Sequence, residues 1–372
     1  GAIFEGTLSP QRIIEQLSVY SGKKIQPADT LLIFDEVQEM PRALTSLKYF
    51  AEEAPEYAIC CAGSLLGVAL HEGTSFPVGK VEFLDLYPLS FREFLLANGE
   101  EMLLDYILND GHRDLAAFTE KLTDYLKKYF VIGGMPSAVL KWLDTHDFFE
   151  VDDVQKQLLA AYENDFSKHA PRQMIEKIRY VWDSIPSQLA KENKKYVYGA
   201  VKKSARAADF ELAIQWLIDA GLVYKVQRVN APRLPFKFYE DHNAFKLFML
   251  DVGLMGAMAE ASAESILVGD NIFSEYEGAF TELYVFTQLT SQGISLYYHS
   301  VDNSTIEIDF LAAYKDHVVP IEVKAEVNVK SKSLRTFITR NPGLKGLRFS
   351  MLPYEQQDWM TNIPLYACIV AF

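Results

Sequence analysis

The chain has 372 residues, of which 49% are hydrophobic and 23% are charged. This composition is typical of a globular protein, and the length allows roughly two to four domains. The net charge of −14 argues against a protein that coats nucleic acid in general, although it is compatible with a local basic face.

Cysteine usage and hydropathy favour the cytoplasm. The chain has three cysteines, and the adjacent pair Cys60 and Cys61 follows Ala58-Ile59 in a segment that predicts a buried strand, so we expect no disulfide framework. No apolar run approaches the roughly 18–20 residues that span a bilayer. The first residues lack the basic-then-apolar order of an export signal. We therefore expect a cytoplasmic protein without membrane contact.

Residues 1–95 alternate helix and strand signals, which predicts a parallel sheet. The expected elements are a helix over 10–20, a strand over 31–34, a helix over 44–53 and a strand over 57–62. The first strand runs directly into Asp35 and Glu36. In a nucleotide-hydrolysing sheet, one carboxylate at this place binds Mg²⁺ and a second polarises water.

A strand of this kind works beside a phosphate loop of the form G-x-x-x-x-G-K-[ST]. The 29 residues before Thr30 contain no such loop. The nearest candidate, Ser21-Gly22-Lys23-Lys24, has one glycine and no Ser or Thr after the lysine. The pattern therefore leaves open an ATPase, a former ATPase or a piece of one.

Residues 89–179 read as mostly helical, with a break at Gly133-Gly134-Met135-Pro136. Over 187–229 the order is short helix, helix, long helix and strand, which is the layout of a winged helix-turn-helix. Basic residues gather there, and we expect either phosphate contact with DNA or a solvated helix face. The basic residues are Lys191, Lys194, Lys195, Lys202, Lys203 and Arg206.

The last part of the chain predicts an α/β module. We expect helices over 277–288 and 331–339, and strands over 295–299, 305–313, 318–325, 347–351 and 365–370.

The segment IEIDFLAAYKDHVVPIEVKA, residues 306–325, predicts a β-hairpin that turns at Lys315-Asp316. This register places Asp309 opposite Glu322. Because side chains alternate between the two faces of a strand, the hairpin should carry an acidic face and an apolar face. The predicted acidic face consists of Glu307, Asp309, Glu322 and Lys324, and the apolar face of Ile306, Ile308, Phe310, Ile321 and Val323.

Three carboxylates on one face repel one another, by roughly 4 kcal/mol for each pair at about 4 Å and an effective dielectric near 20. Mg²⁺ or Mn²⁺, or the neighbouring lysine, would relieve that repulsion. Such an ion generates a hydroxide nucleophile, and Lys324 would stabilise the developing charge. The alternative is the solvent-facing polar side of an amphipathic hairpin.

The spacing D-x₁₂-E-x-K on adjacent strands resembles the core of the restriction-endonuclease-like PD-(D/E)xK nucleases. The resemblance implies that Asp309 and Glu322 bind metal and that Glu282, rather than Glu277, joins them from the preceding helix. Ile308 stands where this family usually has proline.

Six longer motifs resemble one prokaryotic family of AAA+-superfamily ATPases with a C-terminal nuclease-like domain: LLIFDEVQEMPRALTSLKYF, AGSLLG, LDLYPLSFREFL, GGMPSAV, DAGLVYKV and EIDF…IEVKA. In that family a phosphate-loop strand lies upstream of the position where this chain begins, so we expect that the chain lacks its first stretch. The resemblance assigns Asp35 to Mg²⁺, Glu36 to the water and Ser64 to a polar sensing position. Lys80 stands where the family commonly has arginine, and Arg92 is the alternative finger residue.

The expected fold class is multidomain α/β. Its parts are a truncated P-loop NTPase sheet over 1–95, a helical lid over 96–180, a winged helix over 181–245 and a restriction-endonuclease-like domain over 246–372. The first functional hypothesis is an ATP- and Mg²⁺-dependent enzyme that acts on DNA. The second is a nucleotide-regulated switch that recruits a protein partner and cuts nothing. The Asp309, Glu322 and Lys324 set favours the enzyme, whereas the net charge favours the switch.

Overall fold

The computed structural model describes residues 2–63, 79–109, 111–191, 195–201, 206–268, 277–301, 306–325 and 331–372. The chain divides into two compact units, one of residues 1–86 with 215–222, and one of residues 87–214 with 223–372. Among the described residues, no helix combines the length and the apolar character needed to cross a membrane. Four predicted site residues lie outside the described residues: Ser64, Lys194, Lys202 and Lys203.

The smaller unit contains two parallel strands, β1 (Leu31–Phe34) and β2 (Ala58–Cys61), with Phe34 level with Cys61. Its helical elements are η1 (Ala2–Phe4), α1 (Pro10–Ser21), η2 (Val37–Glu39) and α2 (Pro41–Glu53). Pro10 and Pro41 each open a helix, where their missing N–H costs nothing. The predicted strand–helix–strand order is therefore confirmed.

Only one face of this two-stranded sheet is covered in the described part of the chain. Phe34, Ile59 and Cys61 pack toward a core built from the helical elements, whereas Leu31 and Ile33 are 57% and 64% exposed. Cys60 is also exposed. The expectation of a fully buried strand is therefore wrong for the uncovered face, because helices that cover only one side leave every second side chain bare.

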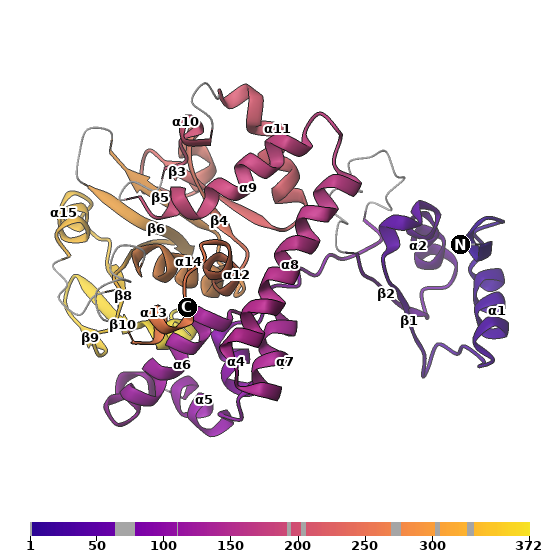
Figure 1. The fold of residues 1–372 in the computed structure, drawn as a ribbon, viewed down its shortest axis with the longest axis horizontal. Coiled ribbons are helices and arrows are strands. Elements are labelled where there is room, and N and C mark those ends of the chain that lie inside the picture. Colours follow the sequence, from indigo (N-terminus) through magenta and orange to yellow (C-terminus); the bar gives the residue numbers. More distant parts are fainter. Residues whose placement is uncertain are drawn as a thin grey trace. The chain divides into compact units, whose positions relative to one another are not determined.

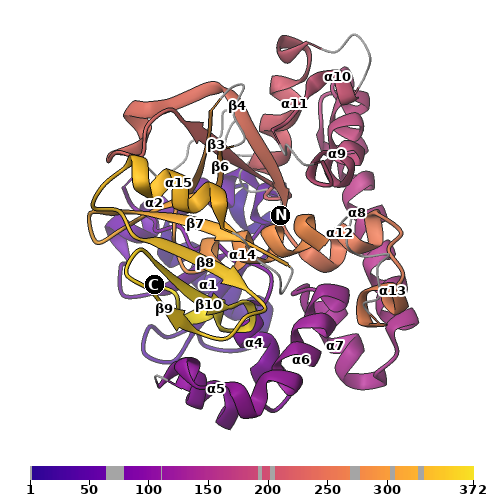
Figure 2. The ribbon, with the colours of Figure 1, turned by 90° about the vertical axis from the view of Figure 1, so that its left-hand side faces the viewer.

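The larger unit is built on a sheet of eight described strands in the order β4-β3-β5-β6-β7-β8-β10-β9 (Figure 1). Figure 2 shows β7, β8, β10 and β9 side by side. The strands are β3 (Val223–Val229), β4 (Glu240–Met249), β5 (Leu296–Ser300), β6 (Glu307–Tyr314), β7 (His317–Val323), β8 (Gly346–Ser350), β9 (Glu355–Gln356) and β10 (Met360–Pro364).

Helices occupy both the first part of this unit and the two sides of its sheet. They are α4 (Phe91–Ala97), α5 (Glu101–Leu108), α6 (Thr119–Ile132), α7 (Pro136–Thr145), α8 (Phe148–His169), α9 (Ile175–Leu189), α10 (Tyr198–Val201), α12 (Val252–Met258), α13 (Ala263–Val268), α14 (Glu277–Thr290) and α15 (Lys332–Arg340). Of α11 (Ala207–Asp219), residues 207–214 belong to this unit. Short 3₁₀ helices are η3 (Gly111–Arg113), η4 (Ala116–Phe118), η5 (Phe236–Tyr239) and η7 (Leu365–Val370).

Two sequence-based expectations differ from this topology. The hairpin of β3 and β4 joins the large sheet at its edge through β5, so the expected boundary at 245/246 falls inside β4. Residues 365–370, expected as a strand, form η7 instead. A short, fully apolar run has no periodicity that separates a strand from a buried helix, which explains this error.

Candidate functional site

The turn after β1 carries the two carboxylates expected of an ATPase. The amide of Ala62 donates to the carbonyl of Phe34 at 2.9 Å, and the amide of Val37 donates to the carbonyl of Ala62 at 3.0 Å. These bonds hold Asp35 and Glu36 beside the end of β2. Both carboxylates are exposed.

The backbone of this turn is strained at Glu36. Its φ is 48°, in the left-handed region that a residue with a side chain adopts rarely. Its amide donates to Oδ1 of Asp35 at 3.0 Å, and its own Oε2 accepts from Nε2 of Gln38. Strained positions of this kind gather at functional sites, where the surrounding structure enforces them.

Lys80 and Arg92, the two candidate finger residues, lie in different units of the chain, and the described residues show no ion pair of Lys80 with Asp35 or Glu36. Lys80 lies 3.7 Å from the carboxylate of Glu52 on α2, in an exposed pair that contributes little to stability. Arg92 is exposed on α4, which belongs to the larger unit. The structure thus brings Asp35 and Glu36 together, whereas Lys80 stands beside an acidic residue of its own unit.

The acidic hairpin has the predicted register at its turn and a bulge at its open end. On β6 and β7, Phe310 pairs with Ile321 and Tyr314 with His317, as predicted. On the other side of β6, however, the register with β5 shifts by one residue between Tyr297 and His299. Two residues of β6, Asp309 and Phe310, therefore stand opposite Tyr298 alone. A β-bulge of this kind re-aims the side chains beyond it.

The bulge divides the predicted acidic face between the two sides of the sheet. Glu307 contacts Lys246, which also contacts Glu282 of α14. Glu322 instead stands opposite Arg348 in the parallel register of β7 and β8. The guanidinium of Arg348 donates to Ser331 at the start of α15. Glu307 therefore lies on the α14 side, and Glu322 lies on the α15 side.

The apolar residues of the hairpin divide in the same way. Ile308 packs with Phe337 of α15, whereas Phe310 contacts Phe286 of α14 with ring centroids 6.2 Å apart. Strict alternation predicted one common face for Ile308 and Phe310. That prediction is wrong because one extra residue in a strand reverses every side chain beyond it.

Lys246 stands at the centre of the α14-side acids. Its ammonium lies 2.9 Å from a carboxylate oxygen of Glu282 and 2.9 Å from one of Glu307, and its side chain is fully buried. It also lies 4.9 Å from the ring centroid of Tyr298. Burial lowers the pKa of Lys246, but Glu282, Glu307 and Asp309 outweigh it and raise the pKa above the ordinary lysine value.

Glu322 has a different environment. Its Oε1 lies 3.8 Å from the ammonium of Lys324, while its Oε2 is buried and has no hydrogen-bond partner among the described residues. Asp309 lies close to this pair through the backbone, because its Oδ2 accepts from the amide of Val323 at 2.7 Å.

The α14-side acids do not fit a divalent metal. Within the part of the chain that the structure describes, no group of three or more His, Cys, Asp or Glu side chains is arranged to hold one. The ammonium of Lys246 already forms an ion pair with both Glu282 and Glu307. At about 4 Å and an effective dielectric near 20, a divalent ion would be repelled by that ammonium by about 8 kcal/mol.

Sequence reasoning missed Lys246 because its partners are distant in the chain. One signal was available: Lys246 is the single charged residue in the otherwise apolar run of residues 244–250. A lysine in such a run is almost always paired when it is buried.

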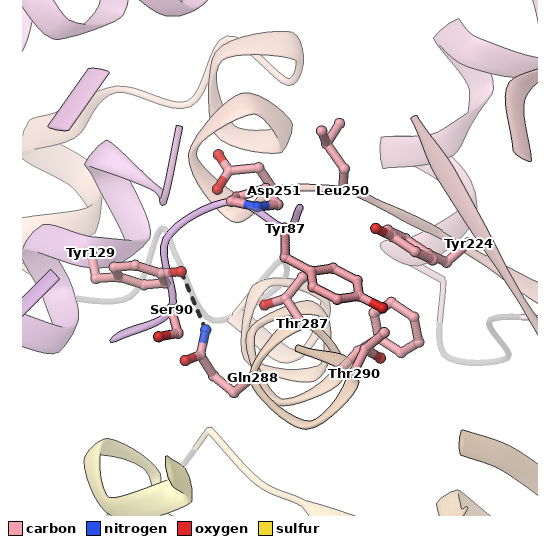
Figure 3. A pocket seen from close by; sticks show the side chains of 11 residues that line it. Tyr87, Ser90, Tyr129, Tyr224, Leu250, Asp251, Thr287, Gln288 and Thr290 are labelled. Atoms are coloured by element: carbon pink, nitrogen blue, oxygen red, sulfur yellow. Dashed lines mark hydrogen bonds between the residues drawn. The ribbon is translucent and has the colours of Figure 1, made fainter. Parts of the chain in front are cut away.

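A small pocket in the larger unit lies under residues 87–90 (Figure 3). Gln288 donates to the hydroxyl of Tyr129 at 3.2 Å and accepts from the amide of Phe91, and the hydroxyl of Tyr129 donates to the carbonyl of Leu89. These bonds anchor the motif LYPLS. The pocket is lined by Tyr87, Pro88, Ser90, Tyr129, Tyr224, Leu250, Asp251, Phe286, Thr287, Gln288 and Thr290.

Of the basic residues expected at DNA, the described structure includes Lys191, Lys195 and Arg206, and Lys191 is exposed. Arg206 is exposed just before α11. Lys195 is half-buried. The hydrogen bond from Arg228 is the main reason that the pKa of Asp241 on β4 is lowered, and the charge of Lys195 adds to it.

Comparison with known proteins assigns the first part of the chain. Residues 6–95 match the model of an AAA domain, and this range contains β1, β2 and the Asp35-Glu36 turn. This part of the chain is similar to AAA domains. Residues 123–265 match a domain of unknown function (DUF8612), and residues 277–367 match another domain of unknown function (DUF4143).

Two further comparisons add little to this AAA-type assignment. No curated protein matches the chain. A solved structure titled as the Walker-type ATPase of Pyrococcus abyssi is 15% identical, covers 68% of each chain and superposes with a TM-score of 0.40.

Proposed function

We propose that the chain is a nucleotide-regulated protein of the AAA type, whose larger unit acts on a protein partner and does not cut DNA. Asp35 is the residue that would bind Mg²⁺, and Glu36 is the residue that would orient the attacking water. Their exposed carboxylates at the carboxyl end of β1 fit this pair of roles. The bound ion would supply charge stabilisation at the nucleotide phosphates.

The division of the hairpin acids between two faces supports the non-cleaving role. Metal-dependent phosphodiester cleavage requires carboxylates that converge on one ion. Here Glu282, one of the three acids that the nuclease resemblance implies, is paired with Lys246 on the α14 side, whereas Glu322 lies beside Arg348 on the α15 side. This separation is the observation that carries the proposal.

Plasmid nicking tests this role. The chain is incubated with supercoiled DNA in Mg²⁺ or Mn²⁺, beside the variants Asp309→Ala and Glu322→Gln. We expect the wild type to nick no faster than either variant. Wild-type nicking that both substitutions abolish would establish a nuclease and contradict the proposal.

A metal-dependent nuclease acting on DNA is the second candidate function. The bond from the Val323 amide to Asp309 favours it, because this bond holds an aspartate beside Glu322 and Lys324. In this reading Asp309 and Glu322 bind Mg²⁺ or Mn²⁺, Lys324 stabilises the developing charge and Glu282 assists. The pairing of Glu282 with Lys246 opposes the last of these roles.

DNA contact through the basic residues near α10 and α11 belongs to the same candidate. Phosphate contacts would give duplex binding that is independent of sequence and that weakens steeply with salt. The test variant neutralises Lys194, Lys195, Lys202 and Lys203, and the control neutralises Lys23, Lys24, Lys48 and Lys345. A loss of binding and of salt slope in the test variant alone would support DNA contact, whereas equal behaviour would leave a solvated face.

A further inference from the structure

The side chains between β4 and α14 pair in two successive steps. Lys246 meets Glu282, and two residues along the strand Phe248 stacks on Phe286 at 4.6 Å with an angle of 10° between the rings. Glu282 and Phe286 are one helical turn apart, so they project from the same face of α14. The aromatic pair therefore fixes the helix at the height at which the ammonium reaches the carboxylate.

We propose that Lys246 is a built-in cation, which takes the place that a divalent metal would hold among Glu282, Glu307 and Asp309. We call these four residues the Lys246 cluster. The inference rests on the non-cleaving role proposed above and deepens it, and it concerns a site within the larger unit.

The burial and chemistry of the cluster support an ammonium rather than a metal. Lys246 is 0% exposed and Glu282 is 2% exposed, and buried charges of this kind are retained only when they are paired. The ring of Tyr298, itself 1% exposed, provides an aromatic face to the cation. A metal site uses oxygen or imidazole ligands on all sides, whereas an aromatic face suits an ammonium.

Removal of the ammonium should create a metal site. In Lys246→Met, the carboxylates of Glu282 and Glu307 would lose the counter-charge that they share, and a divalent cation would balance these two charges. Wild-type protein should therefore show no Mn²⁺-dependent rise in melting temperature. Lys246→Met should show a rise of several degrees, because the ion binds only the folded state.

The experiment compares wild type, Lys246→Met and Lys246→Gln in EDTA and in Mn²⁺, with bound Mn²⁺ counted by electron paramagnetic resonance. Lys246→Gln keeps amide donors for both carboxylates, so it provides a folded test if Lys246→Met unfolds in EDTA. Lys225→Met is the control, because Lys225 is an exposed lysine of β3 that lies over Phe245 instead of among carboxylates.

Mn²⁺-dependent stabilisation of either Lys246 variant, with none in wild type or Lys225→Met, would support the proposal. Refolding of Lys246→Met by Mn²⁺ would count equally. The proposal is overturned if wild type gains a stabilisation that Glu282→Gln abolishes, or if neither Lys246 variant responds to Mn²⁺. Plasmid nicking does not enter this test, so its outcome is independent of the assay for cleavage.

Discussion

Asp251 is a buried carboxylate that ties the start of α12 to the turn after α6. It is 2% exposed, its Oδ2 accepts from the amide of Gly134 at 2.6 Å, and its Oδ1 accepts from the amide of Leu254 at 2.9 Å. Burial raises the pKa of Asp251 from 3.8 to about 6, and the amide bonds only partly oppose this rise. The folded protein therefore binds a proton here more readily than the unfolded chain does.

This shift predicts a pH-dependent stability with a defined sign. Because the folded pKa of Asp251 lies above the unfolded value, protonation of Asp251 stabilises the folded state. This stabilisation is fully present below about pH 4 and is lost as the pH rises through about 6. The full loss is about 3 kcal/mol, from a shift of about two pKa units. Urea unfolding of wild type and Asp251→Asn should be measured across this pH range. The unfolding free energy should fall with rising pH more steeply in wild type than in Asp251→Asn. Parallel pH profiles would contradict the assignment.

The same carboxylate constrains the element next to it, the turn between α6 and α7. Gly133 has a φ of 71°, and a Cβ there would lie 2.1 Å from Oδ1 of Asp251. Gly99 has a similar φ of 78°, with open space around its missing side chain. Backbone strain is therefore common to both positions, and the clash exists at Gly133 alone.

We expect Gly133→Ala to destabilise the fold more than Gly99→Ala does. Each substitution carries a strain of about 1 kcal/mol, and Gly133→Ala must also displace a buried carboxylate, which adds roughly 2 kcal/mol or more. Urea unfolding of the two variants measures the difference. Equal losses of stability would contradict this expectation, because they would show that the Asp251 carboxylate moves aside without a loss of free energy.

The turn of the β6–β7 hairpin is a place where a substitution should stabilise the fold. Lys315 and Asp316 both have positive φ, 45° and 63°, as a two-residue turn with the twist of its strands requires. Replacement of Lys315-Asp316 by Asn-Gly should raise the unfolding free energy by about 1 kcal/mol, because these residues adopt positive φ more readily. A lower melting temperature would contradict this, and Lys315→Ala controls for the loss of the contact with Tyr314.

The sequence predicts this hairpin down to the pairing of its turn, since local turn chemistry and alternation determine both. It does not predict the bulge at Asp309-Phe310, because the bulge depends on the pairing of β6 with β5 and on the packing of α14 and α15 against the two faces of the sheet. The positions of Glu307 and Glu322 on opposite sides follow from that bulge. Likewise, the Asp35-Glu36 turn is evident from the pattern, whereas the exposure of Ile33 depends on which face of β1 is covered.

For the molecule as a whole, the proposed nucleotide role belongs to the smaller unit, and the Lys246 cluster belongs to the larger one. The 372 residues contain no G-x-x-x-x-G-K-[ST] loop. The backbone amides and the lysine of such a loop hold the β and γ phosphates. We therefore expect residues 1–372 alone to hydrolyse no ATP, measured as phosphate release with Mg²⁺-ATP. Turnover that Glu36→Gln abolishes would contradict this expectation.

The central claim for the larger unit is that its acids are divided, with a lysine in place of a metal. A crystal soaked in Mn²⁺ and measured at the manganese absorption edge would reveal any bound metal ion. We expect density for the Lys246 ammonium between Glu282 and Glu307 and no anomalous peak at either face of the hairpin. An anomalous peak bound by both Asp309 and Glu322 would contradict it.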